Sequence, residues 1–399
     1  MSDDCSNVGP RPAPGAAFRS SQAPMSVSAS LILRAPDSPV VLARDHAVDL
    51  LKGLACLLMV LAHVPFPDAP WLNIATMGSV LFFTSTGMNL WGLVSRERGD
   101  EARIAANGLF LIFAGFANNY VQGTLGQADV FQSAGMAMIA MLGLRWLWPR
   151  GWTWLFPLPF AIHYLNQHVF YWKIHDGGVS SFFLTPGLFP LLPWLSFYLM
   201  GAHLKRYPSP RMRLAVAASA LAALGVVVGR AGWDFNKFWM SPDYWLLGLA
   251  FPALLLDAIR RWLGRRPRPP WGEIRFWGAN SLVFYILHSL VLRFFGIWIP
   301  GGVWLLLAGV AGTALLLRPG LWLQAWARER SPWGVLAGAG LLAGAILGLE
   351  AGYLGGSYFA RTFISFGLTL AFVAAYPAFK RLSDRLPRAL PRREWMLHS

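Results

Sequence analysis

Twelve apolar stretches, separated by short loops rich in Gly and Pro, restrict the folds open to this sequence. Most are long enough to cross the hydrocarbon core of a bilayer, which is about 30 Å thick. Backbone polar groups have no water to bind in lipid, so such stretches predict helices. We therefore expect an all-α, polytopic integral membrane protein with about 10–12 transmembrane helices in one bundle. The stretches cover about residues 48–66, 71–94, 103–121, 131–148, 151–165, 184–204, 213–230, 243–263, 276–299, 301–317, 333–350 and 362–379.

The composition agrees with a membrane protein. Charged residues make up 13% of the chain, against about 25% in a typical soluble domain. The two cysteines, Cys5 and Cys56, predict neither a disulfide framework nor a metal site. Residues 1–40 are rich in Ser, Pro and Ala and lack a basic start followed by an apolar core. They are predicted to be a disordered cytoplasmic tail and no signal peptide.

The basic residues predict an orientation. Loops after even-numbered stretches, together with the C-terminal tail, carry 24 Lys and Arg residues, whereas the opposite loops carry only four: Lys173, Arg230, Lys237 and Arg361. Positive loops stay in the cytoplasm. We therefore expect a multi-pass protein of the cell membrane with both termini in the cytoplasm. Topology also accounts for the formal charge of +15, so binding to nucleic acid is an unnecessary hypothesis.

The first apolar helix carries unusual polar residues. In RDHAVDLLKGLACLLMVLAH, residues 44–63, helical geometry places Asp49, Lys52, Cys56 and His63 within about 60° of one another. The orientation puts Asp49 and Lys52 near the cytoplasm and His63 near the outer end. Ionisable groups inside a membrane are costly and indicate a functional site. The alternatives are an interfacial hydrogen bond for His63, an ion pair between Asp49 and Lys52, and a positive anchor for Lys52.

Two later stretches contain further candidates. His288 lies at mid-depth in WGANSLVFYILHSLVLR, where it either faces a functional cavity or makes a structural hydrogen bond. Arg293 is expected to extend to the outer interface. Pro190 and Pro193, in FPLLPW, are interpreted as prolines inside an apolar helix, which would free backbone carbonyls. The remaining histidines do not have a convincing metal spacing, and His203, at the end of a stretch, is expected to be solvated.

Motifs for ATP hydrolysis, dinucleotide redox chemistry and zinc proteolysis are absent. The stretch VDLLKGLACLLMVLAH instead resembles the first-helix signature of the transmembrane acyltransferase superfamily, with Asp49 and His63 fourteen residues apart. Four further stretches are similar to the heparan-α-glucosaminide N-acetyltransferase family and its bacterial relatives, and the acyltransferase-3 family is a more distant match. These stretches are DVFQSAGM at 129–136, FPLLPWLSFYLMGAHL at 189–204, NKFWMSPDYWLL at 236–247 and ANSLVFYILHSLV at 279–291.

The resemblance implies a domain at 45–292 that moves an acyl group from cytoplasmic acyl-CoA to an outward-facing acceptor. Residues 293–380 then add helices to the same bundle, and 381–399 form a basic cytoplasmic tail. His63 and His288 become acid/base candidates, and Asp49 and Lys52 become candidates for binding acyl-CoA. Gln132, Trp194 and Asp243 become candidates for binding the acceptor. Two positions depart from the family pattern: Lys52 replaces an arginine, and Ser133 stands where the N-acetyltransferase branch has arginine.

Three functions remain open at this level. The first is an acyltransferase, expected to use acetyl-CoA and no metal, that acylates an amine or hydroxyl of a sugar-like acceptor. The second is an O-acyltransferase of surface polysaccharide. The third is a carrier or flippase without chemistry, against which the absence of an inverted repeat weighs. The expected partners are the lipid bilayer, acyl-CoA and a carbohydrate-like acceptor, and the sequence leaves a homodimer open.

Overall fold

A computed structural model of the chain describes residues 45–66, 74–95, 100–122, 127–170, 179–184, 188–265, 271–349 and 358–385. From Asp45 onward they belong to one compact unit. The predicted tail at 1–40 lies outside these ranges, and so does the predicted tail at 381–399 beyond residue 385, whereas its residues 381–383 continue a helix. Within them every regular element is helical, which confirms the predicted all-α class. The long helices are α1 His46–Ala62, α2 Met77–Val94, α3 Glu101–Gln122, α4 Val130–Leu147, α6 Leu191–Arg206, α7 Pro210–Ala231, α8 Pro242–Gly264, α10 Ser281–Gly296, α11 Gly302–Glu329, α12 Pro332–Leu349 and α13 Tyr358–Ser383.

Each long helix falls on one of the predicted apolar stretches. The short fifth stretch becomes a 3-10 turn at Trp152–Leu155 followed by the eight-residue helix α5 at Leu158–Leu165. Among the described residues, α4, α7 and α11 are individually long and apolar enough to cross a membrane. The pair α9 (Gly272–Ala279) and α10 adds a fourth span if it is counted as one broken span.

Two details of the predicted helices are wrong. The ninth stretch is not one helix, because α9 and α10 meet at Asn280 with a bend of 95°. Pro190 and Pro193 do not interrupt a helix either, since Pro190 is the N-cap of α6 and Pro193 lies in its first turn. The first N–H groups of a helix have no partner within the helix, so a proline in this turn breaks no hydrogen bond.

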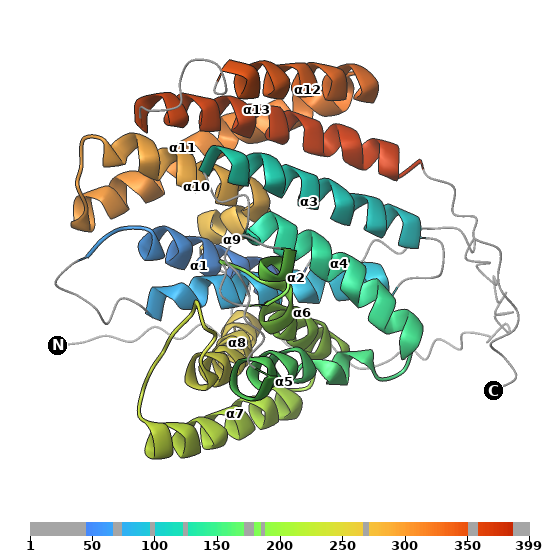
Figure 1. The fold of residues 1–399 in the computed structure, drawn as a ribbon, viewed down its shortest axis with the longest axis vertical. Helices are drawn as coiled ribbons and strands as arrows, with labels where there is room; N and C mark the ends of the chain where they lie inside the picture. The colour runs from blue at the N-terminus through green and yellow to red at the C-terminus, as the bar shows by residue number, and fades with distance from the viewer. Residues whose placement is uncertain are drawn as a thin grey trace, which may run out of the picture. The chain divides into compact units, whose positions relative to one another are not determined.

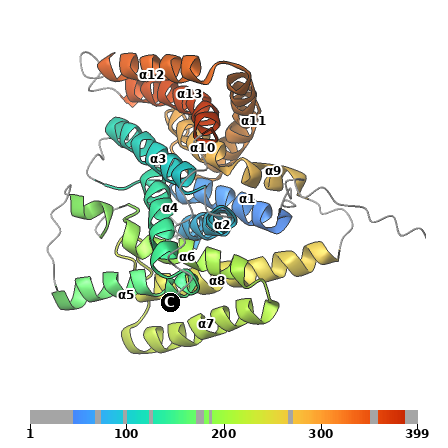
Figure 2. The ribbon, with the colours of Figure 1, turned by 90° about the vertical axis from the view of Figure 1, so that its right-hand side faces the viewer.

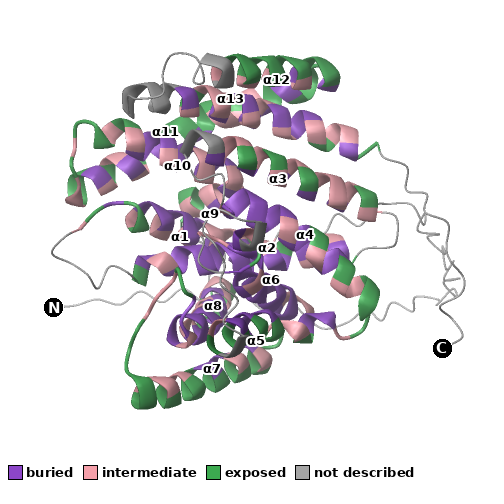
Figure 3. Ribbon diagram, viewed as in Figure 1, coloured by how far each residue is buried: buried purple, intermediate pink, exposed green. Residues whose placement is uncertain are grey.

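Helices α1, α2, α6 and α8 form the buried centre of the unit. In Figure 1, α2 lies between α1 and α6, and the packing of α2 against both helices agrees with this view. Figure 2 shows α7 beside α8 on one side, and α11, α12 and α13 together on the other. Buried residues concentrate in α1, α2 and α6, whereas α7 and α12 are largely exposed (Figure 3). The polar stripe of α1 therefore belongs to the buried centre of the unit.

Pairs of glycines bring three helix pairs into backbone contact. A Cβ added at Gly201 of α6 would collide with the backbone of Thr84 in α2, and one at Gly87 of α2 would collide with the backbone of Tyr198 in α6. Small residues permit such close approach between helices in apolar surroundings. Two other helix pairs make the same kind of contact: α3 and α4 through Gly108 and Gly135, and α1 and α9 through Gly53 and Gly278.

Asp45 fixes the start of α1 to two other helices. Its Oδ1 accepts the backbone N–H groups of Ala47 and Val48 and so caps the helix. Its Oδ2 accepts hydrogen bonds from Lys205 Nζ of α6 at 2.7 Å and from Arg260 Nη2 of α8 at 3.2 Å. Burial raises the pKa of this carboxyl, but the hydrogen bond and charge of Lys205 and the charge of Arg260 outweigh that effect. The pKa of Asp45 therefore lies below its ordinary value of 3.8.

An Asp45→Asn variant is expected to show a pH-dependent loss of stability. Asparagine retains an oxygen for the cap but has no charge for Lys205 and Arg260, so the variant should be less stable by about 1 kcal/mol at neutral pH. Because the pKa of Asp45 is lowered in the folded protein, its carboxylate contributes its full stabilisation at pH values above the unfolded-state pKa. This stabilisation is lost as the pH falls through the folded-state pKa. Melting curves of the purified protein from pH 7 to pH 3 should therefore converge at the acidic end. A constant difference over this range would contradict the assigned ion pairs.

A buried ion pair joins α7 to α8. Arg213 donates to Asp257 Oδ1 from Nε at 3.2 Å and from Nη2 at 2.8 Å, and the two side chains are only 3% and 6% exposed. Arg261 lies 2.6 Å from the other carboxylate oxygen. Removing one partner of such a pair leaves a buried charge uncompensated.

We expect Asp257→Ala to lower the free energy of unfolding by about 3–5 kcal/mol. Glu273→Ala is the matched control, because it breaks the ion pair with Arg318, whose side chains are 67% and 63% exposed. That control should cost less than about 1 kcal/mol. Thermal melting of both variants in the same detergent measures the difference. Equal losses of stability would show that the pair between Arg213 and Asp257 contributes no more than an exposed ion pair.

Candidate functional site

His63 stands at the end of the polar stripe, as the C-cap of α1. Its Nδ1 lies 2.7 Å from the carbonyl oxygen of Met59, one turn earlier. A carbonyl oxygen only accepts, so Nδ1 carries the hydrogen in this contact. Nε2 of the neutral ring is then unprotonated, and the side chain is exposed. The local helix geometry thus orients the ring and leaves one nitrogen able to accept a proton.

His288 of α10 meets this ring from a distant part of the sequence. The two ring centroids are 5.2 Å apart, with an interplanar angle of 67°. His288 is fully buried, and the rings of Phe284 and Tyr285 pack beside it. The carbonyls of Phe284 and Tyr285 lie close to its ring, but their geometry does not give hydrogen bonds. Neither ring nitrogen of His288 has a hydrogen-bond partner among the described residues. Buried polar groups normally have one, so this ring is suited to meet a ligand or a water molecule.

Aromatic rings connect the histidine pair to Lys52. Lys52 Nζ lies 5.8 Å from the ring centroid of Phe82. Phe82 lies 6.0 Å from Tyr285, which in turn lies 5.4 Å from His288. Lys52 and His63 themselves are eleven residues apart on one helix, which is about 16 Å of rise. The predicted stripe is thus one structural feature, with aromatic side chains alongside it and a histidine pair at its end.

The two helices that meet at the bend, α9 and α10, contact opposite ends of α1. Gly278 of α9 packs against the backbone of Asp49, and α10 carries His288 to His63. Arg275 of α9 also donates to Nδ1 of His46, at 2.8 Å, beside the start of α1. The segments before and after the bend therefore contact different parts of α1.

Lys237 belongs to the same region, although its place in the sequence indicated only an outer-loop charge. It lies in the loop between α7 and α8, with Nζ 4.6 Å from the ring centroid of Phe189. It is close enough for its charge to act on His63. Burial lowers the pKa of Lys237 to about 8, so its charge can be lost near neutral pH. No sequence pattern indicated this contact, because the loop and α1 are far apart in the chain.

Asp243 shapes the loop that carries Lys237. Its buried carboxylate accepts the backbone N–H groups of Asp234 at 2.9 Å and Phe235 at 2.7 Å, and the hydroxyl of Ser241. These contacts use the carboxylate to hold the loop. Asp243 was predicted to bind the acceptor, and that role stays a prediction.

Gln132 and Trp194 are both buried. Gln132 completes a capping box at the start of α4, where its Oε1 accepts Asp129 N at 2.7 Å and Asn119 Nδ2 at 3.0 Å. Its Nε2 has no partner among the described residues. Trp194 packs within an aromatic cluster, 5.0 Å from both Phe83 and Phe189. Trp194 therefore packs against the ring that contacts Lys237, whereas Gln132 stabilises the start of α4, and the role of both residues in acceptor binding stays a prediction.

His203 differs from its expected environment. The side chain is fully buried rather than solvated, and its ring lies 4.3 Å from Trp154 and 4.8 Å from Tyr207. Aromatic residues of the segment before α5 cover it, a contact that the end of an apolar stretch cannot indicate. It is distinct from the histidine pair.

No family model, curated protein or solved structure matches this chain.

Proposed function

We propose that this protein is an integral-membrane acyltransferase in which His63 and His288 form the reacting centre. The observation that carries the proposal is their contact: two histidines 225 positions apart in the sequence lie with ring centroids 5.2 Å apart. One ring has an unprotonated nitrogen, and the other is buried without a protein partner among the described residues. Such a pair suits a reaction that removes a proton and later returns it.

Membrane insertion is supported by the outer surface of the helices. Among the described residues, α7 and α11 are long, apolar and largely exposed. Exposed side chains on them include Leu214, Leu221, Leu315 and Trp322. Apolar surface of this extent on an isolated soluble protein would favour aggregation, whereas a bilayer would cover it. We propose a multi-pass protein with 10–12 spans and cytoplasmic termini.

The reaction requires one proton acceptor that becomes a proton donor. The amine or hydroxyl of the acceptor gives its proton to Nε2 of His63 and attacks the thioester carbonyl of acetyl-CoA. The tetrahedral adduct then breaks its C–S bond, and the imidazolium returns the proton to the departing CoA thiolate. His288, in contact with His63, is placed to orient the acceptor or to share the proton. The products are the acetylated acceptor and CoA.

The cytoplasmic end of α1 is suited to the phosphates of acyl-CoA. Lys52, Arg275, Lys205 and Arg260 surround the first turns of this helix, with Asp45 offsetting part of their charge. The pantetheine arm would then extend along the polar stripe towards the histidines, with Phe82 and Tyr285 beside it. The resemblance described above supports the same assignment for Asp49 and Lys52.

The test is transfer of labelled acetyl groups from acetyl-CoA by the full-length protein in proteoliposomes. Glucosamine and a polysaccharide would be offered as acceptors, and CoA release would be followed with the product. Mild alkali removes O-acetyl esters and leaves amides, so it separates the two acyltransferase hypotheses. Acceptor transport without CoA release would exclude acyl transfer and establish the carrier hypothesis instead.

A further inference from the structure

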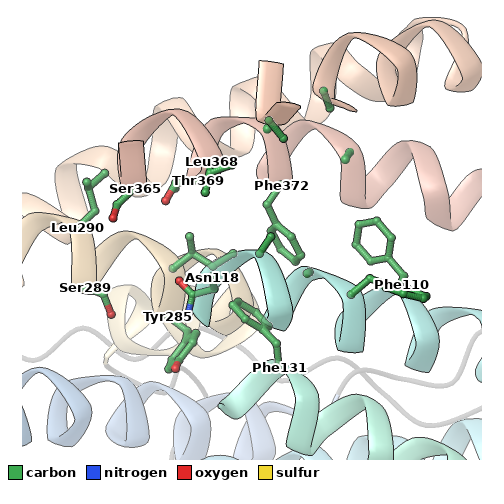
Figure 4. Close-up of a pocket in the computed structure, with 18 of the residues that line it drawn as sticks. Phe110, Asn118, Phe131, Tyr285, Ser289, Leu290, Ser365, Leu368, Thr369 and Phe372 are labelled. Carbon is green, nitrogen blue, oxygen red and sulfur yellow. The ribbon is translucent and has the colours of Figure 1, made fainter. Parts of the chain in front are cut away.

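The histidine pair lies in largely apolar surroundings. The rings of Phe284 and Tyr285 pack beside His288. Tyr285 also lines a cavity of about 410 Å³ between α3, α10, α12 and α13, whose walls consist mainly of Ala, Leu and Phe side chains (Figure 4). Acyl transfer passes through a tetrahedral adduct whose oxygen carries a negative charge. Such a charge is costly in apolar surroundings, so the reacting centre needs a cation or fixed hydrogen-bond donors close to it.

Lys237 is a cation without a counter-ion close to this centre. Its side chain is half-buried, and its charge acts on His63. Nζ lies 4.6 Å from the ring centroid of Phe189 and 5.5 Å from that of Phe238. Within the part of the chain that the structure describes, no carboxylate forms an ion pair with Lys237 and no acceptor takes a hydrogen bond from it. Aromatic faces attract a cation without neutralising it, so this ammonium group is able to bind an anion.

Hydrogen bonds fix the loop on both sides of Lys237. The buried carboxylate of Asp243 accepts the two backbone N–H groups that precede Asn236. Asn236 Oδ1 accepts the two that follow Lys237, at 3.0 and 3.1 Å. Ser241 then closes the loop, because its Oγ accepts the N–H of Asn236 at 2.8 Å and its own N–H donates to the carbonyl of Asn236 at 2.9 Å. The backbone of Lys237 is therefore held in one place.

The backbone is also strained on either side of Lys237. Phe235 has φ +46° and Met240 has φ +48°, in the left-handed region that favours glycine. Strained conformations persist only where the surrounding contacts enforce them, and they concentrate at functional sites. The hydrogen bonds of this loop are such contacts. A group fixed in advance stabilises a developing charge effectively, because it need not rearrange when the charge forms.

We propose that Lys237 is a further catalytic residue, whose ammonium group binds the oxyanion of the tetrahedral adduct. The acceptor nitrogen or oxygen bonds to the thioester carbon, and the π electrons of the C=O bond move onto the oxygen, which Lys237 contacts. These electrons re-form the C=O bond as the C–S bond breaks, and the departing thiolate takes the proton held by His63. Lys237 keeps its own protons throughout. This inference rests on the proposed acyl transfer and adds a group that the two histidines do not supply.

The experiment compares Lys237→Met and Lys237→Arg with the wild type in the proteoliposome assay of acetyl transfer. Methionine keeps an unbranched side chain but no charge, so kcat should fall by about 10²- to 10³-fold, the usual effect of removing one oxyanion donor. KM for acetyl-CoA should change little, because the contact forms only in the transition state. Arginine keeps the charge, so Lys237→Arg should be about tenfold or more faster than Lys237→Met. Arg230→Met is the matched control: it removes an exposed cation of the same connection between α7 and α8, and kcat should be unchanged.

The pH profile separates a catalytic charge from a structural one. Burial lowers the pKa of Lys237 to about 8, so its ammonium group is lost as the pH rises through this value. Arginine stays charged over the same range. The ratio of kcat for Lys237→Arg to kcat for the wild type should therefore rise between pH 7 and pH 9. The titratable groups of the loop and of the histidine pair are the same in both proteins and cancel in this ratio: Asp234, Asp243, His63 and His288.

The outcomes distinguish this inference from the proposed function. No acetyl transfer by the wild type would overturn both. Transfer by the wild type together with an unchanged kcat in folded Lys237→Met, or with equal losses in Lys237→Met and Arg230→Met, would overturn the role of Lys237 and leave acyl transfer standing. Melting in detergent shows whether the variants fold. If Lys237→Met does not fold, the ratio for Lys237→Arg decides, and a ratio that is constant with pH would overturn the role.

Discussion

His63→Gln is expected to lower the rate of acetyl transfer from acetyl-CoA by about 10²- to 10⁴-fold, the usual contribution of a positioned acid/base group. Glutamine can still donate to the carbonyl of Met59, but it has no nitrogen that titrates near neutral pH. His288→Gln should also reduce transfer strongly. His168→Gln is the matched control, because this histidine is exposed and lies in a short helical segment away from the pair.

The assay should separate a chemical defect from a folding defect. All three variants should keep the wild-type melting temperature within a few degrees and elute as single species in detergent. A His63→Gln protein that folds and retains full activity would exclude His63 as the base. Incubation of the wild type with labelled acetyl-CoA and no acceptor tests for an acetyl-histidine, in which the acetyl group passes from the CoA sulfur to a ring nitrogen with release of the thiol. Label on His63 would establish a two-step transfer, and its absence would favour direct attack.

Gly201→Ala is expected to cause a large loss of stability. The new Cβ would overlap the backbone carbonyl of Thr84, and α2 carries Gly87 at the reciprocal contact with Tyr198. Rigid backbone on both sides leaves no side chain to move aside, so α2 and α6 must separate. Overpacking typically costs about 1–3 kcal/mol, and this site should lie at or above the upper value. The melting temperature should fall by roughly 4 °C or more.

The buried thiol of Cys56 provides the measurement. In a Cys5→Ser background it is the only thiol, and it reacts with a fluorescent maleimide only as the core opens. Gly225→Ala is the matched control, because this residue lies in exposed α7 and its added Cβ meets no atom within 4 Å. Alanine favours a helix over glycine by about 0.5–1 kcal/mol, so the control should be neutral or slightly stabilising. Similar melting of both variants would show that α2 and α6 are not in rigid contact.

Some features of the fold and of the candidate site could be predicted from the sequence, and others could not. The helices and their approximate bounds followed from apolar length, and the stripe of Asp49, Lys52 and His63 followed from helical period. Asp45 carried a readable signal, since an aspartate directly before an apolar helix is a common N-cap, but it was not predicted. The contacting glycines were also present as small residues in apolar stretches. The bend at Asn280 also had a readable signal, since Gly278, Asn280 and Ser281 interrupt the apolar pattern and asparagine is a common N-cap, but a single helix was predicted there.

The sequence alone determined that the described chain is helical, which residues share a face of α1, and which ends of the helices are basic. These properties depend on neighbours along the chain, and a fixed helical period converts spacing directly into direction. Only the tertiary structure decided that His63 meets His288, that Lys237 approaches His63, and that α12 and α13 enclose a cavity with α3 and α10. Each of these contacts depends on how each helix is rotated about its own axis and on how far apart neighbouring helices lie. Glycine contacts and one bend set those quantities, and spacing along a single helix carries no information about them.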